Sequence, residues 1–481
     1  MNKLSDEIIN SLSTTIREKV EKVSNNNLNI EEIRLRSQKP LILNANSKDY
    51  FYNQKTMTLD LNQQNSYVVT REDVEQTFQI ICKYSIHSFM DDIKKGFITL
   101  RGGHRVGLVG KAIVEDGQVK NIKHISSLNI RVSREIIGCS DKILSHIIKG
   151  KNQINNTLII SPPQCGKTTL IRDIVRNLSN GNEDYGFKGL KVALVDERNE
   201  IAGAYLGVPQ MDVGIRTDII ETCPKDLGIT MLLRSMSPNV IVTDEIGSEK
   251  EIKALYTALN GGIGLITTVH GDSIDDIQNR KELNRLLDKE LFKKVIILSA
   301  KRGAGTIKGK NQINNTLIIS PPQCGKTTLI RDIVRNLSNG NEDYGFKGLK
   351  VALVDERNEI AGSYLGVPQM DVGIRTDIIE TCPKDLGITM LLRSMSPNVI
   401  VTDEIGSEKE IKALYTALNG GIGLITTVHG DSIDDIQNRK ELNRLLDKEL
   451  FKKVIILSAK RGAGTIEKIY DLEEKRWYFA N

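Results

Sequence analysis

The sequence predicts an α/β protein in which helices cover parallel sheets on both faces, preceded by a smaller α+β domain. From residue 156 onward, short apolar runs rich in β-branched residues alternate with helical patterns, which is typical of a buried parallel sheet. Residues 148–306 are then written out again as residues 307–465, Asn152 returning as Asn311, with Ala204 against Ser363 as the difference between the copies. The same sheet is therefore expected twice.

Within each copy the pattern runs strand, loop, helix. In the first copy, strands are expected at Leu158–Ser161, Leu190–Asp196, Val240–Asp244, Leu265–Val269 and Val295–Ser299. Helices are expected at Lys167–Leu178, Asp226–Met236, Ser248–Leu259 and Ile274–Leu291. A long loop would separate the second strand from the second helix.

Residues 1–138 follow a different pattern and are expected to form the α+β N-terminal domain. The pattern predicts a helix, a strand pair, two further helices, a hairpin and a strand, at Ser5–Val23, Ile33–Leu43, Glu72–Lys83, Phe89–Lys95, Gly96–Gly110 and Asn129–Ser133. The predicted domains are then 1–138, 139–306 and 307–481. A terminal hairpin within Lys468–Ala480 occurs once, after the second copy.

The near identity of the copies indicates a recent duplication inside a unit of 322 residues (481 − 159), because surface positions normally drift. The first copy follows the N-terminal domain and a helix at Ser140–Ile147 directly, whereas the second copy lacks both and has the hairpin. We therefore expect the first copy to retain more activity.

Composition is that of a globular protein. Lys and Arg total 66 against 61 Asp and Glu, too balanced to indicate a nucleic-acid surface, and no nucleic-acid partner is expected. The six cysteines show no C-x-x-C spacing, which favours reduced thiols in a cytoplasmic protein. No apolar run approaches 18 residues, so any work at a membrane would be peripheral.

Each copy carries the sequence Ser-Pro-Pro-Gln-Cys-Gly-Lys-Thr-Thr, which resembles a phosphate-binding loop, between an apolar strand and a helix. Such a loop turns backbone N–H groups toward phosphates at a helix N-terminus, where the helix dipole favours anions. Serine stands at the first position, where the motif usually has glycine. The residues expected to bind ATP are Ser161, Pro162, Pro163, Gln164, Cys165, Gly166, Lys167, Thr168 and Thr169, and again Ser320, Pro321, Pro322, Gln323, Cys324, Gly325, Lys326, Thr327 and Thr328.

Two carboxylates follow the apolar strand that begins at Val240. Asp244 is expected to hold hydrated Mg²⁺ together with Thr168, and Glu245 to orient the attacking water. An ordinary acidic strand end is the alternative. In the second copy, Asp403 and Thr327 are the expected metal ligands and Glu404 the catalytic carboxylate, while Lys167 and Lys326 would neutralise the β- and γ-phosphates.

Two further boxes end in polar residues. Asp196 and Glu197 follow a strand and either face the nucleotide or pair with Arg198. His270 and His429 close another strand, where each would sense the γ-phosphate, although a histidine at a strand end is usually a structural donor.

In this order, the loop, the Val-Asp-Glu-Arg-Asn-Glu box, the Thr-Asp-Glu-Ile-Gly box and the Thr-Thr-Val-His-Gly box resemble the stage III sporulation protein AA family. Gly96–Gly110 and Ser126–Arg134 match as well. The resemblance places this chain among AAA+/RecA-like secretion ATPases that drive type II and type IV systems and pilus assembly. It implies RecA-like P-loop NTPase domains with ATP and Mg²⁺ as cofactors. It also implies that Asp196 and Glu197 form the family's acidic box, Asp244 and Glu245 its Walker B box, and His270 its histidine box, with the roles given above.

The resemblance also implies partners. We expect a homo-oligomeric ring, cytoplasmic or peripheral at the membrane, that energises a membrane-embedded sporulation channel. Arg131 and Arg134 become candidates to touch the nucleotide, and Arg216 is the first choice for an arginine finger. The alternative is a RecA-like ATPase acting on single-stranded nucleic acid, against which the N-terminal domain lacks a basic stripe interleaved with aromatic residues.

Overall fold

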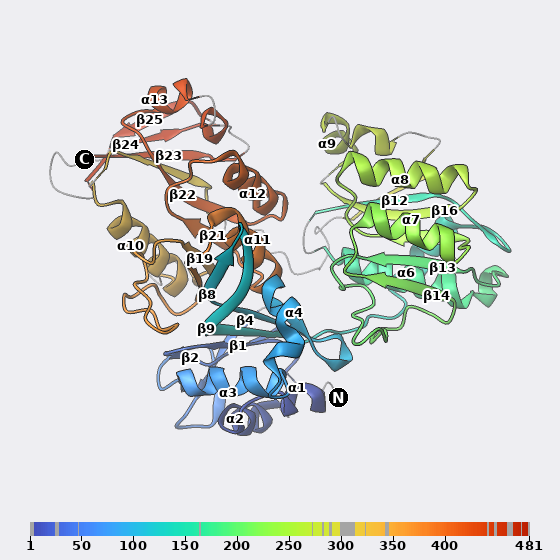
Figure 1. Ribbon diagram of the computed structural model, residues 1–481, viewed down its shortest axis with the longest axis horizontal. Helices are drawn as coiled ribbons and strands as arrows, with labels where there is room; N and C mark the ends of the chain where they lie inside the picture. Colours follow the sequence, from blue (N-terminus) through green and yellow to red (C-terminus); the bar gives the residue numbers. More distant parts are fainter. Residues whose placement is uncertain are drawn as a thin grey trace. The chain divides into compact units, whose positions relative to one another are not determined.

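The computed structural model describes residues 4–24, 28–46, 48–162, 165–271, 273–280, 283–287, 291–298, 313–322, 324–341, 346–439, 442–446, 450–458, 465–472 and 474–479. The chain forms two compact units, both drawn in Figure 1. Unit 1 comprises Met1–Ile98, Arg105–Val132 and Ile307–Asn481, and unit 2 comprises Thr99–His104 and Ser133–Thr306. The first copy of the repeat therefore lies in unit 2 and the second copy in unit 1.

Unit 2 is built on a six-stranded sheet whose neighbouring strands are all parallel. Its strands, in spatial order, are β14 (Thr217–Glu221), β13 (Val192–Asp196), β15 (Val240–Thr243), β16 (Gly264–His270), β12 (Thr157–Ser161) and β17 (Lys294–Ile297). Its helices are α5 (Asp141–Ile147), α6 (Lys167–Asn180), α7 (Lys225–Ser235), α8 (Glu249–Asn260) and α9 (Ile274–Asn279).

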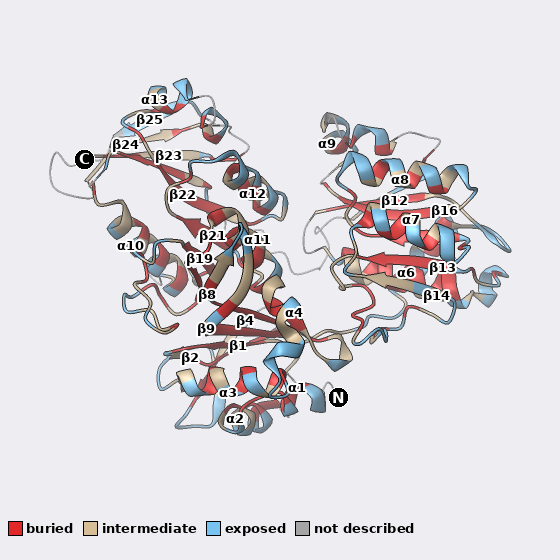
Figure 2. Ribbon diagram, in the orientation of Figure 1, coloured by how far each residue is buried: buried red, intermediate tan, exposed pale blue. Residues whose placement is uncertain are grey.

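Helices cover both faces of this sheet, as the apolar pattern predicts. Alternate residues of β13 point to opposite faces. Ala193 and Val195 belong to a buried cluster shared with α7 and α8, and Val192 and Leu194 to a second cluster shared with α5 and α6. Figure 2 shows the central strands buried between these helices. The fold class expected for the repeat, a parallel sheet covered by helices, is confirmed.

Two expectations for the first copy were wrong. The long loop after β13 contains an edge strand, β14, whose short run Thr-Asp-Ile-Ile-Glu alternates too little to indicate a strand. The helix expected over Ile274–Leu291 is interrupted, because Arg280 takes an extended conformation that ends α9. The Arg280 guanidinium binds the carbonyl of His270 at 2.9 Å, which ties this break to the end of β16.

Unit 1 repeats the same parallel order and extends it at both edges into a 15-stranded sheet. The strands of the second copy are β18 (Thr316–Ser320), β19 (Val351–Asp355), β20 (Thr376–Glu380), β21 (Val399–Thr402), β22 (Gly423–His429) and β23 (Lys453–Ser458). Its helices are α10 (Lys326–Asn339), α11 (Lys384–Ser394), α12 (Glu408–Asn419) and α13 (Ile433–Asn438). The expected terminal hairpin is present as β24 (Thr465–Asp471) and β25 (Arg476–Phe479), paired antiparallel beside β23.

The N-terminal domain supplies the other edge. Its strands are β1 (Ile30–Arg36), β2 (Lys39–Pro40), β3 (Ile42–Ala45), β4 (Lys48–Asn53), β5 (Thr58–Asp60), β6 (Val68–Val69), β7 (Phe97–Thr99), β8 (Arg105–Glu115) and β9 (Gln118–Arg131). Its helices are α1 (Asp6–Asn10), α2 (Thr14–Ser24), α3 (Arg71–Ile81) and α4 (Met90–Lys95). The single helix expected over Ser5–Val23 is two helices, and the backbone N–H of Ser13 between them donates to the Thr77 hydroxyl at 3.1 Å.

The N-terminal domain forms one unit with the second copy, not with the copy that follows it in the sequence. β8 lies beside β20 in parallel, with Lys111 opposite Glu380, so the sheet runs on from the second copy into β8, β9 and β1. This corrects the expectation that the second copy lacks this domain. Sequence order could not indicate the choice, because both copies offer the same edge strand.

A buried ion network joins the two parts of unit 1. Asp377 of β20 accepts hydrogen bonds from Arg34 at 3.0 Å and from Arg36 at 2.6 and 2.9 Å. Lys350 pairs with Glu32 at 2.6 Å. Burial by itself would raise the pKa of the Glu32 carboxyl, but Arg34 and Lys350 hold that pKa well below its usual range.

None of the helices in the described part of the chain combines the length and the apolar character that spanning a membrane requires.

Candidate active site

The motif that begins at Ser161 lies between β12 and α6, as the sequence predicts. Gly166 has φ +79° and α6 begins at the next residue, Lys167, so glycine supplies a left-handed conformation that other residues rarely adopt. The N-cap residue of α6 is Gly166, which has no side chain to cap the helix. A helix start without an N-cap side chain leaves its first N–H groups able to bind anions.

The second copy has the same geometry, with Gly325 at φ +80° before Lys326.

In the first copy, Ser161 stands where the motif usually has glycine. It is buried, and its hydroxyl donates to the carbonyl of Pro162 at 2.8 Å. Pro163, Gln164 and Gln323 lie outside the described residues. The role of the loop in binding ATP stays a prediction.

Asp244 follows β15 and is buried. Its Oδ1 atom has no hydrogen-bond partner within the described structure. Burial and the neighbouring Glu245 raise the pKa of Asp244 to about 7, against the opposing effect of Lys225. Asp403 of the second copy likewise has an Oδ1 atom that accepts no hydrogen bond from a described residue, and burial raises its pKa. A buried carboxylate oxygen without a donor fits a cation.

Glu245 lies at the centre of a cationic cluster. Its Oε1 atom is 2.8 Å from Lys167 Nζ and 2.9 Å from His270 Nε2, and its Oε2 atom is 2.5 Å from Arg198 Nη1. Burial by itself would raise the pKa of Glu245, but His270, Arg198 and Lys167 hold it well below its usual range. Burial in turn lowers the pKa of Lys167.

The backbone at Glu245 is strained, with φ +46°, in a region that non-glycine residues visit rarely. The corresponding Glu404 has φ +27°. Such strain persists only where surrounding contacts hold it, and it concentrates at functional sites. In the second copy, Glu404 Oε1 lies 2.7 Å from His429 Nε2, whose ring nitrogens lie 2.8 and 3.0 Å from Lys326 Nζ.

The acidic box after β13 divides its roles. Asp196 accepts the backbone N–H groups of Glu200, Ile201 and Ala202 at 2.8–3.0 Å, so its carboxylate organises its own loop. Glu197 pairs with Lys225 at 2.5 Å, while Arg198 reaches Glu245 instead. The pairing of these two acids with Arg198, left open from the sequence, is not present.

Sequence reasoning missed Lys225 and Lys384. Both are buried; Lys225 binds Glu197, and Lys384 Nζ lies 3.6 Å from Asp403 Oδ1. A signal was available, because each lysine opens a helix directly after a proline, where the helix dipole disfavours a cation. A lysine there needs anionic partners nearby.

The candidate arginines lie elsewhere. Arg216 donates to the carbonyls of Ser179 and Asn180 at 2.7 and 3.2 Å, at the C-terminus of α6, the opposite end from Lys167. Arg131 belongs to unit 1 and Arg134 to unit 2, so one compact unit does not hold both.

The residues present fit ATP and Mg²⁺. The start of α6 with Lys167 would take phosphates, and Thr168 with Asp244 would take the cation. The described residues contain no group of three or more His, Cys, Asp or Glu that could hold a metal by themselves. Mg²⁺ usually keeps several waters and binds one or two carboxylates together with substrate phosphates.

The chain matches the family described as "Sporulation stage III, protein AA" over residues 2–314 and again over residues 309–477. Stage III sporulation protein AA of Bacillus subtilis (strain 168) is 38% identical over 307 residues, which are 64% of this chain and 94% of that protein. Protein SEEDLING PLASTID DEVELOPMENT 1 of Arabidopsis thaliana is 30% identical over 222 residues, 46% of this chain and 28% of that protein.

Two solved structures are similar at low identity. The pilus retraction motor PilT, solved with bound ADP, has a TM-score of 0.40 and 15% identity, covering 61% of this chain and 78% of its own. The VirB11 ATPase of the Brucella suis type IV secretion system, solved with sulphate, has a TM-score of 0.36 and 10% identity, covering 95% and 98%.

Proposed function

Because this chain belongs to the sporulation stage III protein AA family, we propose that it is a Mg²⁺-dependent ATPase of the secretion-motor type. The observation that supports this most strongly is the convergence of Lys167, Glu245 and His270. They follow or end β12, β15 and β16, which are neighbours in one parallel sheet. Ligands of such sheets bind beyond the carboxyl ends of the strands.

The start of α6 would bind the phosphates of ATP. Its N-cap residue is a glycine without a side chain to cap the first backbone N–H groups, and the helix dipole adds a partial positive charge there. Lys167 would neutralise the β- and γ-phosphates, since its ammonium follows the loop directly. Lys326 would do the same in the second copy.

Thr168 and Asp244 would hold Mg²⁺ in the first copy, and Thr327 and Asp403 in the second. The Oδ1 atoms of both aspartates accept no hydrogen bond from a described residue, and Lys384 Nζ lies 3.6 Å from that of Asp403. The cation, when bound, supplies positive charge that offsets charge developing on the phosphates.

Glu245 would orient the attacking water and accept its proton. The low pKa imposed by His270, Arg198 and Lys167 keeps the carboxylate ionised. His270 and Arg198 hold opposite oxygens of this carboxylate and would position it.

Lys167 must exchange partners during the cycle. It now shares Glu245 Oε1 with His270, and a phosphate would compete for the same ammonium. Phosphate binding would thus release Glu245 from Lys167 and leave it positioned by His270 and Arg198. Nucleotide binding and activation of the carboxylate would be coupled through this one ion pair.

A ring of subunits is the proposed assembly, with membrane-embedded channel proteins of sporulation as partners and a cytoplasmic or peripheral location. The N-terminal domain packs on an ATPase core other than the one that follows it directly. An arrangement in which each N-terminal domain joins a neighbouring core is a head-to-tail contact, and such contacts form a ring when the rotation between neighbours closes.

The test is hydrolysis by two double variants. Lys167→Ala with Lys326→Ala should abolish phosphate release, because both phosphate-binding ammonium groups are gone. Glu245→Gln with Glu404→Gln should keep ATP binding and lower turnover at least a hundredfold, since a neutral amide cannot accept a proton. Exposed Lys250→Ala with Lys409→Ala is the matched control.

Retained turnover in the lysine double variant would remove the ATPase assignment. Stimulation of hydrolysis by single-stranded DNA would instead favour a nucleic-acid motor.

A further inference from the structure

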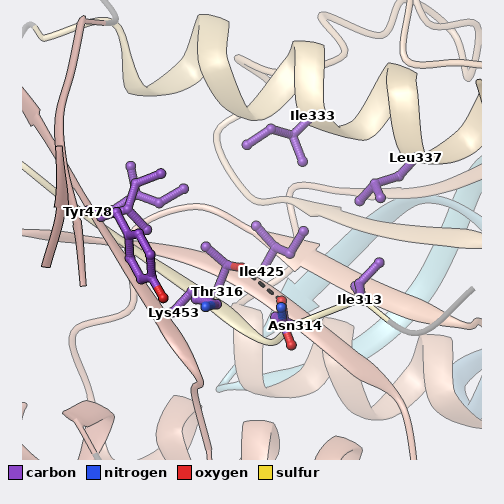
Figure 3. Close-up of a pocket in the computed structure, with 10 residues that line it drawn as sticks. Ile313, Asn314, Thr316, Ile333, Leu337, Ile425, Lys453 and Tyr478 are labelled. Atoms are coloured by element: carbon purple, nitrogen blue, oxygen red, sulfur yellow. Dashed lines mark hydrogen bonds between the residues drawn. The ribbon is translucent and has the colours of Figure 1, made fainter. Parts of the chain in front are cut away.

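Unit 1 contains an apolar groove beneath α10, with a volume of about 610 Å³. Figure 3 shows Ile333 and Leu337 of α10 facing Ile425 and Ile313 across it, with Tyr478 of the terminal hairpin at one end. Pockets of roughly 300–1,000 Å³ with apolar walls are typical of binding sites. We name this feature the α10 groove.

The same surface of the first copy is covered by α5. Ile174 and Leu178 of α6, which correspond to Ile333 and Leu337, are fully buried in a cluster that contains Ile147. Ile143 packs against the same cluster. In the second copy, Ile333 and Leu337 are only partly buried. The α10 groove is therefore the surface that α5 covers in the first copy, and no helix among the described residues of unit 1 covers it.

The first turn of α5 is anchored by a carboxylate. Asp173 accepts the N–H of Gly138 at 3.1 Å, the N–H of Ser140 at 2.8 Å and the Ser140 hydroxyl at 2.7 Å. The side chain of Asp173 is 3% exposed, whereas that of the equivalent Asp332 is 52% exposed. Asp332, which accepts hydrogen bonds from the side chains of Arg335 and Asn336 in its own helix, is therefore the exposed equivalent of the carboxylate that holds the start of a helix in the first copy.

The other end of α5 is anchored by an amide. Asn155 donates its backbone N–H to the carbonyl of Ile147 at 2.7 Å and its side-chain amide to the carbonyl of His146 at 2.9 Å. Within the described part of unit 1, the equivalent Asn314 donates neither hydrogen bond, and it lines the groove. The two anchors span a helix of two turns.

We propose that the α10 groove is a docking site for a two-turn amphipathic helix supplied by another polypeptide. The helix begins after a Gly-x-Ser sequence that reaches Asp332, and carries apolar residues four apart, as at Ile143 and Ile147, that enter between Ile333 and Leu337. An amphipathic helix in an apolar groove is a recurrent mode of peptide recognition. The inference does not depend on ATP hydrolysis.

A second copy of this chain is not the expected donor. Each chain has one α5 segment for two equivalent surfaces, and that segment already covers the first copy. A second chain could supply it only by uncovering its own core.

The test uses a fluorescent synthetic peptide with the sequence of Gly138–Lys149, carrying Cys139→Ser, titrated against the full chain. We expect saturable binding of one peptide per chain by fluorescence anisotropy. A peptide with Ile143→Asp and Ile147→Asp should bind at least tenfold more weakly, a result that no folding defect of the protein could produce.

In the protein, Leu337→Asp should weaken peptide binding at least tenfold, and Asp332→Ala several-fold. Lys409→Ala, an exposed change on α12, is the control and should leave binding unchanged. Equal binding of the two peptides, two peptides per chain, or no binding would overturn the proposal. Concentration-dependent dimerisation of the chain that the peptide reverses would assign the groove to a second copy and would also overturn it.

Discussion

Helices α6 and α10 have the same fourteen-residue sequence and different surroundings. Asp173 and Asn177 are buried in α6 because α5 and the segment before it pack there, while Asp332 and Asn336 are exposed in α10. Figure 2 shows the difference between the two helices. The comparison teaches that burial in this protein is decided by segments outside the repeat.

In the edge strands, it is the second copy that is more buried. All five residues of β20 are buried, whereas none of the five in β14 is. The N-terminal domain covers β20 in unit 1, and β14 remains at the edge of the sheet in unit 2. Each copy is therefore completed on a different side, the first by α5 and the second by the N-terminal domain and the terminal hairpin.

The site residues respond to these surroundings. The Glu245 side chain is 14% exposed and that of Glu404 is 26% exposed. Arg198 lies 2.5 Å from its glutamate, and Arg357 lies 3.3 Å from Glu404. The candidate glutamate is thus more buried and closer to its arginine in the first copy, whereas it is closer to its histidine in the second, at 2.7 Å against 2.9 Å.

The largest expected difference comes from matched aspartates of the edge strands. Asp377→Ala should lower the free energy of unfolding of unit 1 by about 3–5 kcal/mol, because it leaves buried Arg34 and Arg36 without their shared anion. Asp218→Ala, the same change on exposed β14, should change stability by about 0.5 kcal/mol or less. Denaturant unfolding checks both, and equal losses would contradict the assignment of the N-terminal domain to the second copy.

The helix pair gives a smaller difference with a pH dependence. Asp173→Asn should cost about 1–3 kcal/mol, because the carboxylate accepts three hydrogen bonds from Gly138 and Ser140. Asp332→Asn, at an exposed position, should cost little. Burial opposes the shift, but the Ser140 hydrogen bonds and Arg176 lower the pKa of Asp173.

The sign follows from that lowered pKa. The native state binds the Asp173 proton less tightly than the unfolded state, so the stabilisation is complete above the ordinary pKa of about 3.9 and is lost as pH falls through the lower native value. The difference in the free energy of unfolding between wild type and Asp173→Asn should therefore be smaller at pH 3 than at pH 7. A gap that is constant with pH would mean that the charge of Asp173 is not what anchors α5.

The single loop variants compare activity. The loss of ATP turnover should be at least threefold larger in Lys326→Ala than in Lys167→Ala, because the N-terminal domain completes the sheet beside the second site. Thr381, which follows β20, donates to the carbonyl of Ala112 of β8 at 2.8 Å. This reverses the order expected from sequence alone. A larger loss in Lys167→Ala would show that α5 matters more to turnover than the N-terminal domain.

The smallest effect is expected at the position where the copies differ. The side chain of Asn199 accepts the backbone N–H of Ala204 at 2.6 Å and donates to the Ala204 carbonyl at 2.7 Å. Asn358 makes the same two hydrogen bonds with Ser363, at 2.7 and 2.8 Å. Ser363→Ala should therefore change the free energy of unfolding by about 0.5 kcal/mol or less. A loss above about 1 kcal/mol would assign the serine hydroxyl a structural role of its own.

Much of the site could be predicted because its parts are local. The glycine before Lys167 and the acids after β15 occur in short motifs whose strand and helix contexts are readable from apolar patterns. Arg198 and Lys225 were missed as site residues because their partners come from other strands and helices. Only the packing of β13 beside β15 brings Arg198 to Glu245.

The sequence by itself determined that two equal copies each form a parallel sheet with a Gly-Lys-Thr helix start, since identical sequences have identical propensities and patterns. Tertiary structure decided which copy receives the N-terminal domain, which keeps α5, and therefore which of two identical residues is buried. The physical reason is that these choices depend on contacts between segments far apart in the chain, such as Arg36 with Asp377. Local patterns that are the same in both copies cannot distinguish them.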